Sequence, residues 1–195
     1  MINKDYLKNL NEAQKEAVLY LDGPLLIVAG AGSGKTKVLT SRIVNIIEKK
    51  RAFPNQILAV TFTNKAAKEM ENRVSKLLGS SAIGLSWLGT FHSICAKLLR
   101  KHASAANLNS NFTIIDTDDQ IRLIKNICKA ENIDTKKLSP RFILAIIDRW
   151  KNKGFYPNEV IINKKDIYEK TILPLYKIYQ QKLTDLNTCD FGDLI

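Results

Sequence analysis

Apolar residues in the first 115 positions of the chain follow two alternating patterns. Two short, largely apolar runs lie at 24–29 and 56–62, and half-apolar segments at 85–90 and 111–116 are a third and a possible fourth strand candidate. Such runs are typical of strands buried in a parallel sheet. Segments with apolar residues three and four positions apart, as on one face of a helix, lie at 10–21, 35–50, 64–79 and 91–103. This alternation predicts an α/β fold with a parallel sheet.

Local signals define three of these helices more closely. Asn11 and Asn64 stand where helical spacing begins, and asparagine is a favoured N-cap residue. Gly79 follows the helix predicted over 64–79, where glycine is typical of a helix end. In the helix over 35–50, the spacing predicts an inward face made of Val38, Leu39, Ile43, Ile46 and Ile47.

The pattern changes near residue 116, after which helical spacing predominates. Helices are predicted over 116–133, 139–154 and 166–183. Ser139 is placed to cap the second of these, with Pro140 in its first turn. Pro174 is expected to kink or split the third, because proline lacks the N–H that a helix interior uses. An α/β half followed by a helical half is therefore expected.

Composition indicates a folded protein and leaves two explanations for its charge. Of 195 residues, 45% are hydrophobic, so a packed core is expected. No run of 18 apolar residues appears and the N-terminus lacks the apolar stretch of a signal peptide, so no membrane association is expected. The net charge of +11 is spread along the chain. It indicates either a polyanionic partner, with nucleic acid first, or a biased genome, and charge alone does not separate the two.

The three cysteines are few, odd in number and far apart. Cys95, Cys128 and Cys189 lack the spacing of a disulfide framework or a zinc site. Their pattern favours a reducing, cytoplasmic location, and each is interpreted as a small buried apolar residue.

The stretch AGAGSGKT at 29–36 has the chemistry of a phosphate-binding loop. Such a loop follows G-x-x-x-x-G-K-[ST] between a strand and a helix, whereas the first position here is Ala29. The glycines let backbone N–H groups converge on phosphate, Lys35 supplies charge for the outer phosphates, and Thr36 a hydroxyl for Mg²⁺. The first position mainly needs a small side chain. We interpret the stretch as a nucleotide site; the alternative is a glycine-rich turn that binds nothing.

Further segments carry motifs in a consistent order along the chain. LNEAQKEAV at 10–18 has the form of a Q motif, AVTFTNKAAKEMENRV at 59–74 of motif Ia, and GTFHSICAKLLR at 89–100 of motif Ib. FTIIDTDDQIRLIK at 112–125 and DFGDLI at 190–195 match the entry to and exit from a helical 1B subdomain. In this order the motifs resemble the UvrD/Rep/PcrA group of superfamily 1 DNA helicases, whose phosphate loop tolerates alanine at its first position. The resemblance covers nearly the whole chain.

This resemblance implies a P-loop NTPase fold with an incomplete RecA-like parallel sheet and an α-helical 1B subdomain. The implied domains are part of RecA-like domain 1A over 1–115, subdomain 1B over 116–189, and a return to 1A at 190–195. The family's DExx box, which supplies carboxylates for Mg²⁺ and water, and its second RecA-like domain are not found in the sequence. An N-terminal fragment is therefore expected, in which an exposed edge or apolar patch favours self-association.

The resemblance also assigns nucleotide-site residues. Lys35 and Thr36 take catalytic roles, with Thr36 on the Mg²⁺ that accompanies ATP. Gln14 would read adenine with an amide that both donates and accepts, although alone it reads as a surface helix glutamine. Lys37 stands where the family often has an arginine stacked on adenine, a contact that lysine makes less well. The implied ATP-binding set is Gln14, Ala29, Gly30, Ala31, Gly32, Ser33, Gly34, Lys35, Thr36 and Lys37.

Motifs Ia and Ib imply a DNA-binding set, because loops at the carboxyl ends of parallel strands are where such sheets bind ligands. Phe62 would present a ring to a base, and its alternative is a core aromatic. His92 would touch DNA, and its alternative is a buried, hydrogen-bonded histidine. The implied DNA-binding set is Phe62, Thr63, Asn64, Lys65, Thr90 and His92.

The function implied is an ATP-dependent DNA helicase, a translocase on single-stranded DNA running 3′ to 5′ and acting at junctions of single and double strands. The fragment alone is expected to bind nucleotide weakly and not to hydrolyse it. One alternative is the helicase-like part of a RecB/AddA-type recombination nuclease. Another is a truncated, non-enzymatic DNA-binding module. The residues do not indicate the pathway, whether DNA repair, replication restart or plasmid copying.

Overall fold

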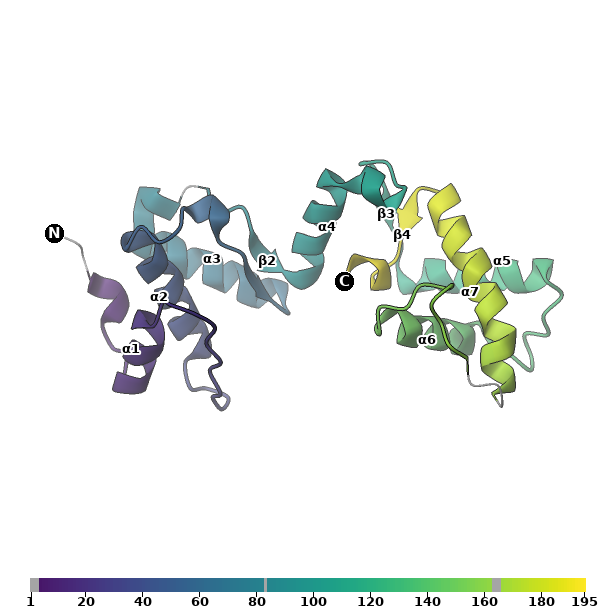
Figure 1. Cartoon of the computed structure of the whole chain (residues 1–195), viewed down its shortest axis with the longest axis horizontal. Coiled ribbons are helices and arrows are strands. Elements are labelled where there is room, and N and C mark those ends of the chain that lie inside the picture. Colours follow the sequence, from purple (N-terminus) through teal and green to yellow (C-terminus); the bar gives the residue numbers. More distant parts are fainter. Residues whose placement is uncertain (1–3, 83, 163–165) are drawn as a thin grey trace. The chain divides into compact units, whose positions relative to one another are not determined.

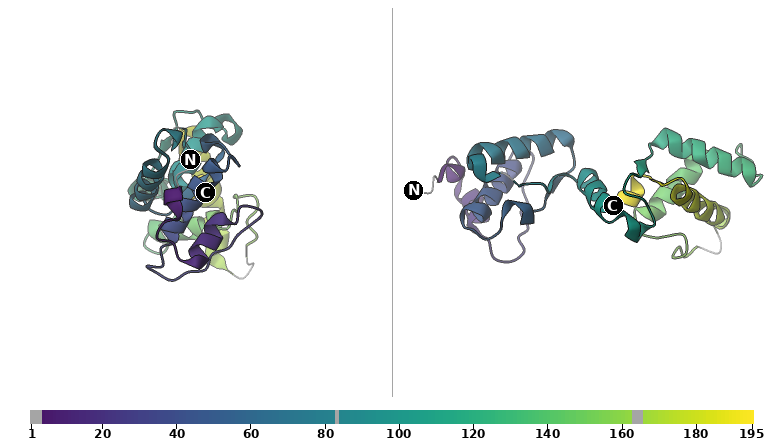
Figure 2. Two further views of the ribbon diagram at one scale, coloured as in Figure 1. Left: turned by 90° about the vertical axis from the view of Figure 1, so that its left-hand side faces the viewer. Right: turned by 90° about the horizontal axis from the view of Figure 1, so that it is seen from above.

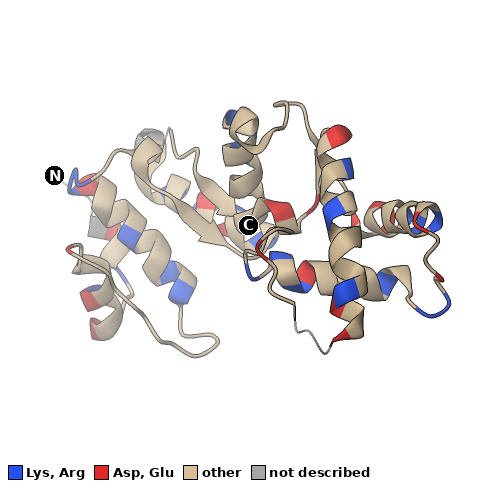
Figure 3. Ribbon diagram, turned by 45° about the vertical axis from the view of Figure 1, so that its right-hand side comes forward, with Lys and Arg blue, Asp and Glu red and all other residues tan. Residues whose placement is uncertain are grey.

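A computed structural model describes residues 4–82, 84–162 and 166–195. The chain divides into two compact units, Met1–Ile94 and Cys95–Ile195. Each combines helices with one short parallel sheet, which confirms a mixed α/β fold (Figures 1 and 2). Lys and Arg residues, blue in Figure 3, lie on helices of both units. No helix in the described part of the chain combines the length and apolar character needed to cross a membrane.

The helices of the first unit pack around α2 (Lys35–Glu48). Both η1 (Lys4–Leu7) and α1 (Glu12–Leu19), purple in Figure 1, contact α2, and so does α3 (Asn64–Leu78). Asn11 caps α1 as predicted, because its side chain accepts the Gln14 N–H at 2.9 Å. Apolar side chains from these helices form the core, among them Val18, Val44, Met70 and Val74.

The sheet of the first unit consists of two short parallel strands. Strand β1 (Ala59–Thr61) follows η2 (Pro54–Gln56), and β2 (Leu88–Thr90) comes after η3 (Gly79–Ala82) along the chain. The register pairs Thr61 with Thr90, so both strands end at the same edge. From that edge α3 begins shortly after β1, and α4 (Phe91–Lys101) begins directly after β2. The strands predicted at 56–62 and 85–90 are confirmed, although they are shorter.

The strand predicted at 24–29 is wrong for this structure. These residues have no strand assignment, and Leu26 and Val28 are 87% and 90% exposed. A strand buried in a parallel sheet needs a neighbouring strand and helices over its faces. Within the residues that the structure describes, β1 pairs with β2, and no strand pairs with 24–29. The run is apolar, but its burial depends on partner segments that a local pattern does not reveal.

Two details of the helices also differ from prediction. Thr63, rather than Asn64, caps α3, because its hydroxyl accepts the Ala66 N–H at 3.2 Å. The helical spacing predicts Leu39 on the inward face of α2, but Leu39 is 38% exposed, whereas Val44 is buried. α2 turns its inward face toward α1 and α3, so the buried stripe lies to one side of the predicted one.

The second unit is a helical core with a small sheet at one side. Helices α5 (Thr117–Ala130), α6 (Pro140–Lys151) and α7 (Ile167–Asp185) contact one another, shown in green to yellow in Figure 1. Ser139 caps α6 as predicted. The remaining elements are η4 (Ala103–Ala106), β3 (Thr113–Ile114), β4 (Thr188–Cys189) and η5 (Gly192–Leu194). β3 and β4 pair in parallel, which brings residues from both ends of this unit together.

Pro174 does not split α7, which continues through it as one helix. On either side of the exposed proline, Ile172 and Leu175 are buried in the core of the second unit. Packing of both halves of the helix against the same core offsets the loss of one backbone hydrogen bond.

The cysteines are free thiols, as expected. Cys128 and Cys189 are buried and Cys95 is partly buried. Burial raises the pKa of the Cys189 thiol to about 12, so it remains protonated and behaves as an apolar side chain.

Candidate functional site

The phosphate loop leads directly into α2. Gly32 and Gly34 have φ values of 76° and 81°, in the left-handed region that glycine enters without strain. Gly34 is the N-cap of α2, and no side chain caps that end. The first backbone N–H groups of a helix lack partners within it, so this uncapped end presents donors and the positive end of the helix dipole.

Lys35 holds the loop together from the first position of the helix. Its Nζ donates to the carbonyl oxygens of Ala29 and Gly30, at 3.0 and 2.6 Å. The Gly30 carbonyl also accepts the Ser33 hydroxyl at 2.7 Å. The interaction at Ala29 uses its backbone, so alanine serves here as well as glycine. The departure from the strict motif therefore removes no contact.

These residues fit a nucleotide phosphate with its Mg²⁺. A Cβ placed on Gly30 or Gly32 would meet nothing within 4 Å, so the loop leaves open space beside its backbone. Lys35 supplies a positive charge, and the uncapped start of α2 adds N–H donors and the positive end of the helix dipole on the same short segment. Thr36 lies in the first turn of α2 and is partly buried, where its hydroxyl can serve Mg²⁺.

Gln14 contacts this loop from α1. Its Oε1 accepts the Asn11 N–H at 3.0 Å, and its Nε2 donates to the Ser33 carbonyl at 2.9 Å. The contact is close, because a Cβ on Gly34 would lie 3.1 Å from the same nitrogen. The structure thus brings Gln14 together with the loop residues, although they are 19 positions apart in the chain.

Lys37 lies in the same turn of α2 as Thr36 but is directed elsewhere. Its Nζ donates to the carbonyl oxygen of Asn9, in the turn that precedes α1, at 2.6 Å. Ala31 and Ser33 are exposed in the loop itself. All residues of the predicted nucleotide site therefore lie in or against a single loop–helix junction.

The ends of β1 and β2 bring two aromatic rings together. Phe62 is 88% exposed and so lies outside the core of the first unit in this structure. Its ring centroid lies 5.3 Å from that of Phe91, at an interplanar angle of 45°. Sequence reasoning did not single out Phe91, yet the parallel register of the two predicted strands would have placed it beside Phe62.

The other predicted DNA-binding residues divide into exposed and buried ones. Asn64 and Lys65 are exposed at the start of α3, which Thr63 caps, and His92 is exposed at the start of α4. Thr90 is only 7% exposed, and its hydroxyl accepts the Ser93 N–H at 3.2 Å. Thr90 therefore shapes the start of α4, while its neighbours present the accessible surface.

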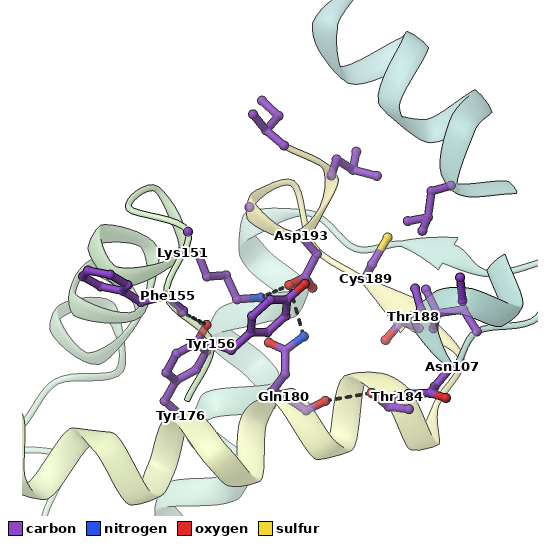
Figure 4. Close-up of a pocket in the computed structure, with 18 residues that line it drawn as sticks. Asn107, Lys151, Phe155, Tyr156, Tyr176, Gln180, Thr184, Thr188, Cys189 and Asp193 are labelled. Atoms are coloured by element: carbon purple, nitrogen blue, oxygen red, sulfur yellow. Dashed lines mark hydrogen bonds and ion pairs between the residues drawn. The ribbon is translucent and has the colours of Figure 1, made fainter. Parts of the chain in front are cut away.

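A separate cluster of charged residues lies in the second unit, beside a cavity of ≈ 470 Å³ (Figure 4). The Lys151 ammonium donates to Asp190 Oδ2 at 2.7 Å and to Asp193 Oδ1 at 2.6 Å. Tyr179 also donates to Asp190 Oδ2, at 2.8 Å. In Figure 4, Lys151, Asp193 and Gln180 converge at the cavity wall.

The charges in this cluster shift one another's titration. Burial alone would raise the pKa of Asp190, but the Lys151 ammonium and the hydrogen bonds from Lys151 and Tyr179 hold it below its usual range. Burial raises the pKa of Asp193, and the negative charge on Asp190 adds to that shift while Lys151 opposes it. Because these groups are bonded to one another, we interpret the cluster as a structural tie between α6 and η5.

The chain belongs to the family of UvrD/REP helicase N-terminal domains, whose model matches residues 10–195. It is 50% identical over 198 residues to the probable DNA helicase II homolog of Rickettsia conorii, covering 100% of this chain and 30% of that protein. It is 46% identical to the ATP-dependent DNA helicase PcrA of Staphylococcus epidermidis and of Bacillus subtilis, covering 97% and 100% of this chain. The chain spans 26% of the length of each PcrA protein.

Proposed function

We propose that this chain forms the N-terminal, ATP- and DNA-binding part of an ATP-dependent DNA helicase. The observation that carries the proposal is the junction of the phosphate loop with α2. There, an uncapped helix start, Lys35 and Thr36 form a phosphate site on a chain of the UvrD/REP family. Its relatives in Rickettsia and Bacillus are named as DNA helicases, which favours this function over a recombination nuclease.

In this proposal the first unit supplies the start of a RecA-like domain and the second contains the helical 1B subdomain. Residues 1–115, 116–189 and 190–195 are assigned to 1A, 1B and the return to 1A. The apolar segment at 24–29 that leads into the phosphate loop is exposed in this chain, with Leu26 and Val28 at 87% and 90%. The same exposure would favour self-association of the isolated chain.

ATP with Mg²⁺ would bind at the loop. When bound, it would supply the phosphoryl group whose hydrolysis drives movement along DNA. Lys35 would exchange its bonds to Ala29 and Gly30 for the outer phosphates, and Thr36 would hold Mg²⁺. The bonds to Asn11 and Ser33 use one lone pair of Gln14 Oε1 and one hydrogen of its Nε2. The second lone pair and the second hydrogen would face the edge of adenine.

Single-stranded DNA would bind across the ends of β1 and β2, with movement 3′ to 5′ and a junction with duplex DNA as the working substrate. Phe62 and Phe91 would stack against bases, while Asn64, Lys65 and His92 would lie near the backbone. Stacking on aromatic rings tolerates any base, as a protein that moves along DNA requires.

Turnover also needs carboxylates for Mg²⁺ and for the attacking water, and two aspartates of the second unit are engaged in other bonds. Asp119 pairs with Arg122 in the first turns of α5, and Asp190 is bonded to Lys151. We therefore expect the 195-residue chain to bind nucleotide without hydrolysing it.

The test is a titration of MgATP against the native chain and the variant Lys35→Ala. Loss of a charged hydrogen-bond donor, worth about 1.5–3 kcal/mol, should weaken binding roughly 10- to 150-fold. Lys15→Ala is the matched control, because Lys15 lies on α1 and its ammonium pairs with Glu12 rather than with a loop residue. Equal affinity of native and Lys35→Ala chains would refute the site.

Steady-state ATP hydrolysis, with and without single-stranded DNA, tests the remainder. DNA-stimulated turnover that disappears in Lys35→Ala would contradict the expected lack of hydrolysis. DNA binding that is indifferent both to ATP and to this variant would support a non-enzymatic binding module instead.

A further inference from the structure

We propose that Lys37 positions Gln14 for selection of the nucleotide base and does so without contacting the base. It acts by holding the turn before α1 in place. The proposal rests on the proposed function, in which Gln14 faces adenine. It assigns Lys37 a role different from that of the stacked arginine common in the family.

The first step is the bond that Lys37 makes. Its Nζ donates to the Asn9 carbonyl oxygen at 2.6 Å, joining residues 28 positions apart. Asn9 has a φ of 60°, so the chain reverses there, two residues before the Asn11 cap of α1. The ammonium is therefore committed to a backbone carbonyl that fixes where α1 begins.

The second step is that this bond acts at the end of α1 that carries Gln14. At the opposite end, Arg42 donates to the Ala17 carbonyl at 2.7 Å, and Asn45 Nδ2 donates to the Val18 carbonyl at 2.9 Å. These contacts join α1 to α2 independently of Lys37. Removal of the Lys37 ammonium should therefore loosen the first turn of α1 while the helix stays packed.

The third step is the sensitivity of Gln14 to such loosening. Its amide bonds both the Asn11 N–H and the Ser33 carbonyl, at 3.0 and 2.9 Å, and leaves little room for a side chain on Gly34. Both bonds are directional, so a small displacement of the first turn misaligns the amide. Discrimination between adenine and guanine depends on that alignment, because position 6 carries an amino donor in adenine and an oxygen acceptor in guanine.

The experiment measures the affinity of the 195-residue chain for MgATP, MgGTP and Mg-tripolyphosphate. In Lys37→Met, which keeps the length of the side chain but not its donor, the ATP:GTP affinity ratio should fall about fivefold, or about 1 kcal/mol. The ATP:tripolyphosphate ratio should fall as well, since the loss concerns the base. Lys37→Arg, which retains a donor, should keep the ATP:GTP ratio within about twofold of native, because stacking of an arginine does not separate adenine from guanine. Lys15→Met, which removes a lysine from α1 itself, is the control and should also leave the ratios at native values.

A double-mutant cycle separates positioning from direct contact. In a Gln14→Ala background, Lys37→Met should have no further effect on the ATP:GTP ratio, because the residue through which it acts is gone. An equal fall in that background would show that Lys37 contacts the base and would overturn the proposal. A native preference for ATP that Lys37→Met leaves intact, or that Lys37→Arg loses equally, would also overturn it. No preference for ATP in the native chain would refute base reading by Gln14 and this proposal with it, whereas the proposed function is refuted separately, by equal affinity of the native and Lys35→Ala chains for MgATP.

Discussion

The exposed ring of Phe62 allows DNA binding and folding to be separated by one substitution. Phe62 is 88% exposed, so only about 12% of its surface is covered by protein. For an aromatic side chain of about 200 Å², that is about 24 Å², or about 0.6 kcal/mol of burial. Loss of the contact with Phe91 adds about 0.5–1.5 kcal/mol. The variant Phe62→Ala should therefore remain folded, with stability reduced by about 1–2 kcal/mol.

Stacking of one base on such a ring is worth about 1–3 kcal/mol, so Phe62→Ala should weaken binding to single-stranded DNA about 5- to 150-fold. Fluorescence anisotropy with a labelled homopolymer strand, at several salt concentrations, measures this. The slope of affinity against salt should not change, because no charge is removed. Phe53→Ala is the matched control, since Phe53 is another exposed aromatic of the same unit, at 72%. Affinity within twofold of native for a folded Phe62→Ala chain would refute the reasoning.

Two further predictions concern the charge cluster of the second unit. Lys151→Met leaves Asp190 and Asp193 buried without their cation and should destabilise this unit by about 3–5 kcal/mol in urea unfolding; a change below 1 kcal/mol would show that the cluster is not a tie. The pKa of Asp190 is lowered by folding, so its contribution to stability is present above the unfolded value of about 3.9 and is lost as pH falls below it. The pKa of Asp193 is raised by folding, so its contribution to stability changes with pH in the opposite sense. Because Asp190→Asn removes the group whose pKa is lowered, this variant should lose less stability than the native chain between about pH 5 and 3. An equal loss would assign the acid sensitivity to other groups.

Local chemistry made the helices and the phosphate loop predictable. Asn11 and Ser139 cap their helices because a short polar side chain reaches backbone N–H groups within its own turn. The loop at 29–36 was equally readable, since its glycines, Lys35 and Thr36 act within a few residues of one another. Asn64 shows the limit of such signals, because Thr63 offers the same capping chemistry one residue earlier.

Contacts between distant residues were not predictable in the same way. The run at 24–29 has the composition of a buried strand, yet burial depends on neighbours that local spacing does not specify. Lys151 and Asp190 meet across 39 positions, and neither stands in a pattern that marks it as buried. Phe91 is an intermediate case, because the motif located it but only the register of β1 and β2 brings it to Phe62.

The two hydrogen bonds of Gln14 restrict which residue can stand at that position, whatever the nucleotide. Glutamate would accept from Asn11 but would set a carboxylate against the Ser33 carbonyl, where a donor is needed. Asparagine has both groups on a side chain one methylene shorter, and methionine or leucine has neither. Of these residues, only glutamine can both accept from the Asn11 N–H and donate to the Ser33 carbonyl oxygen at this distance. Loss of nucleotide binding in a Gln14 variant could therefore result from a disturbed junction between α1 and the loop. Only a comparison of affinities for different bases can show that Gln14 reads adenine.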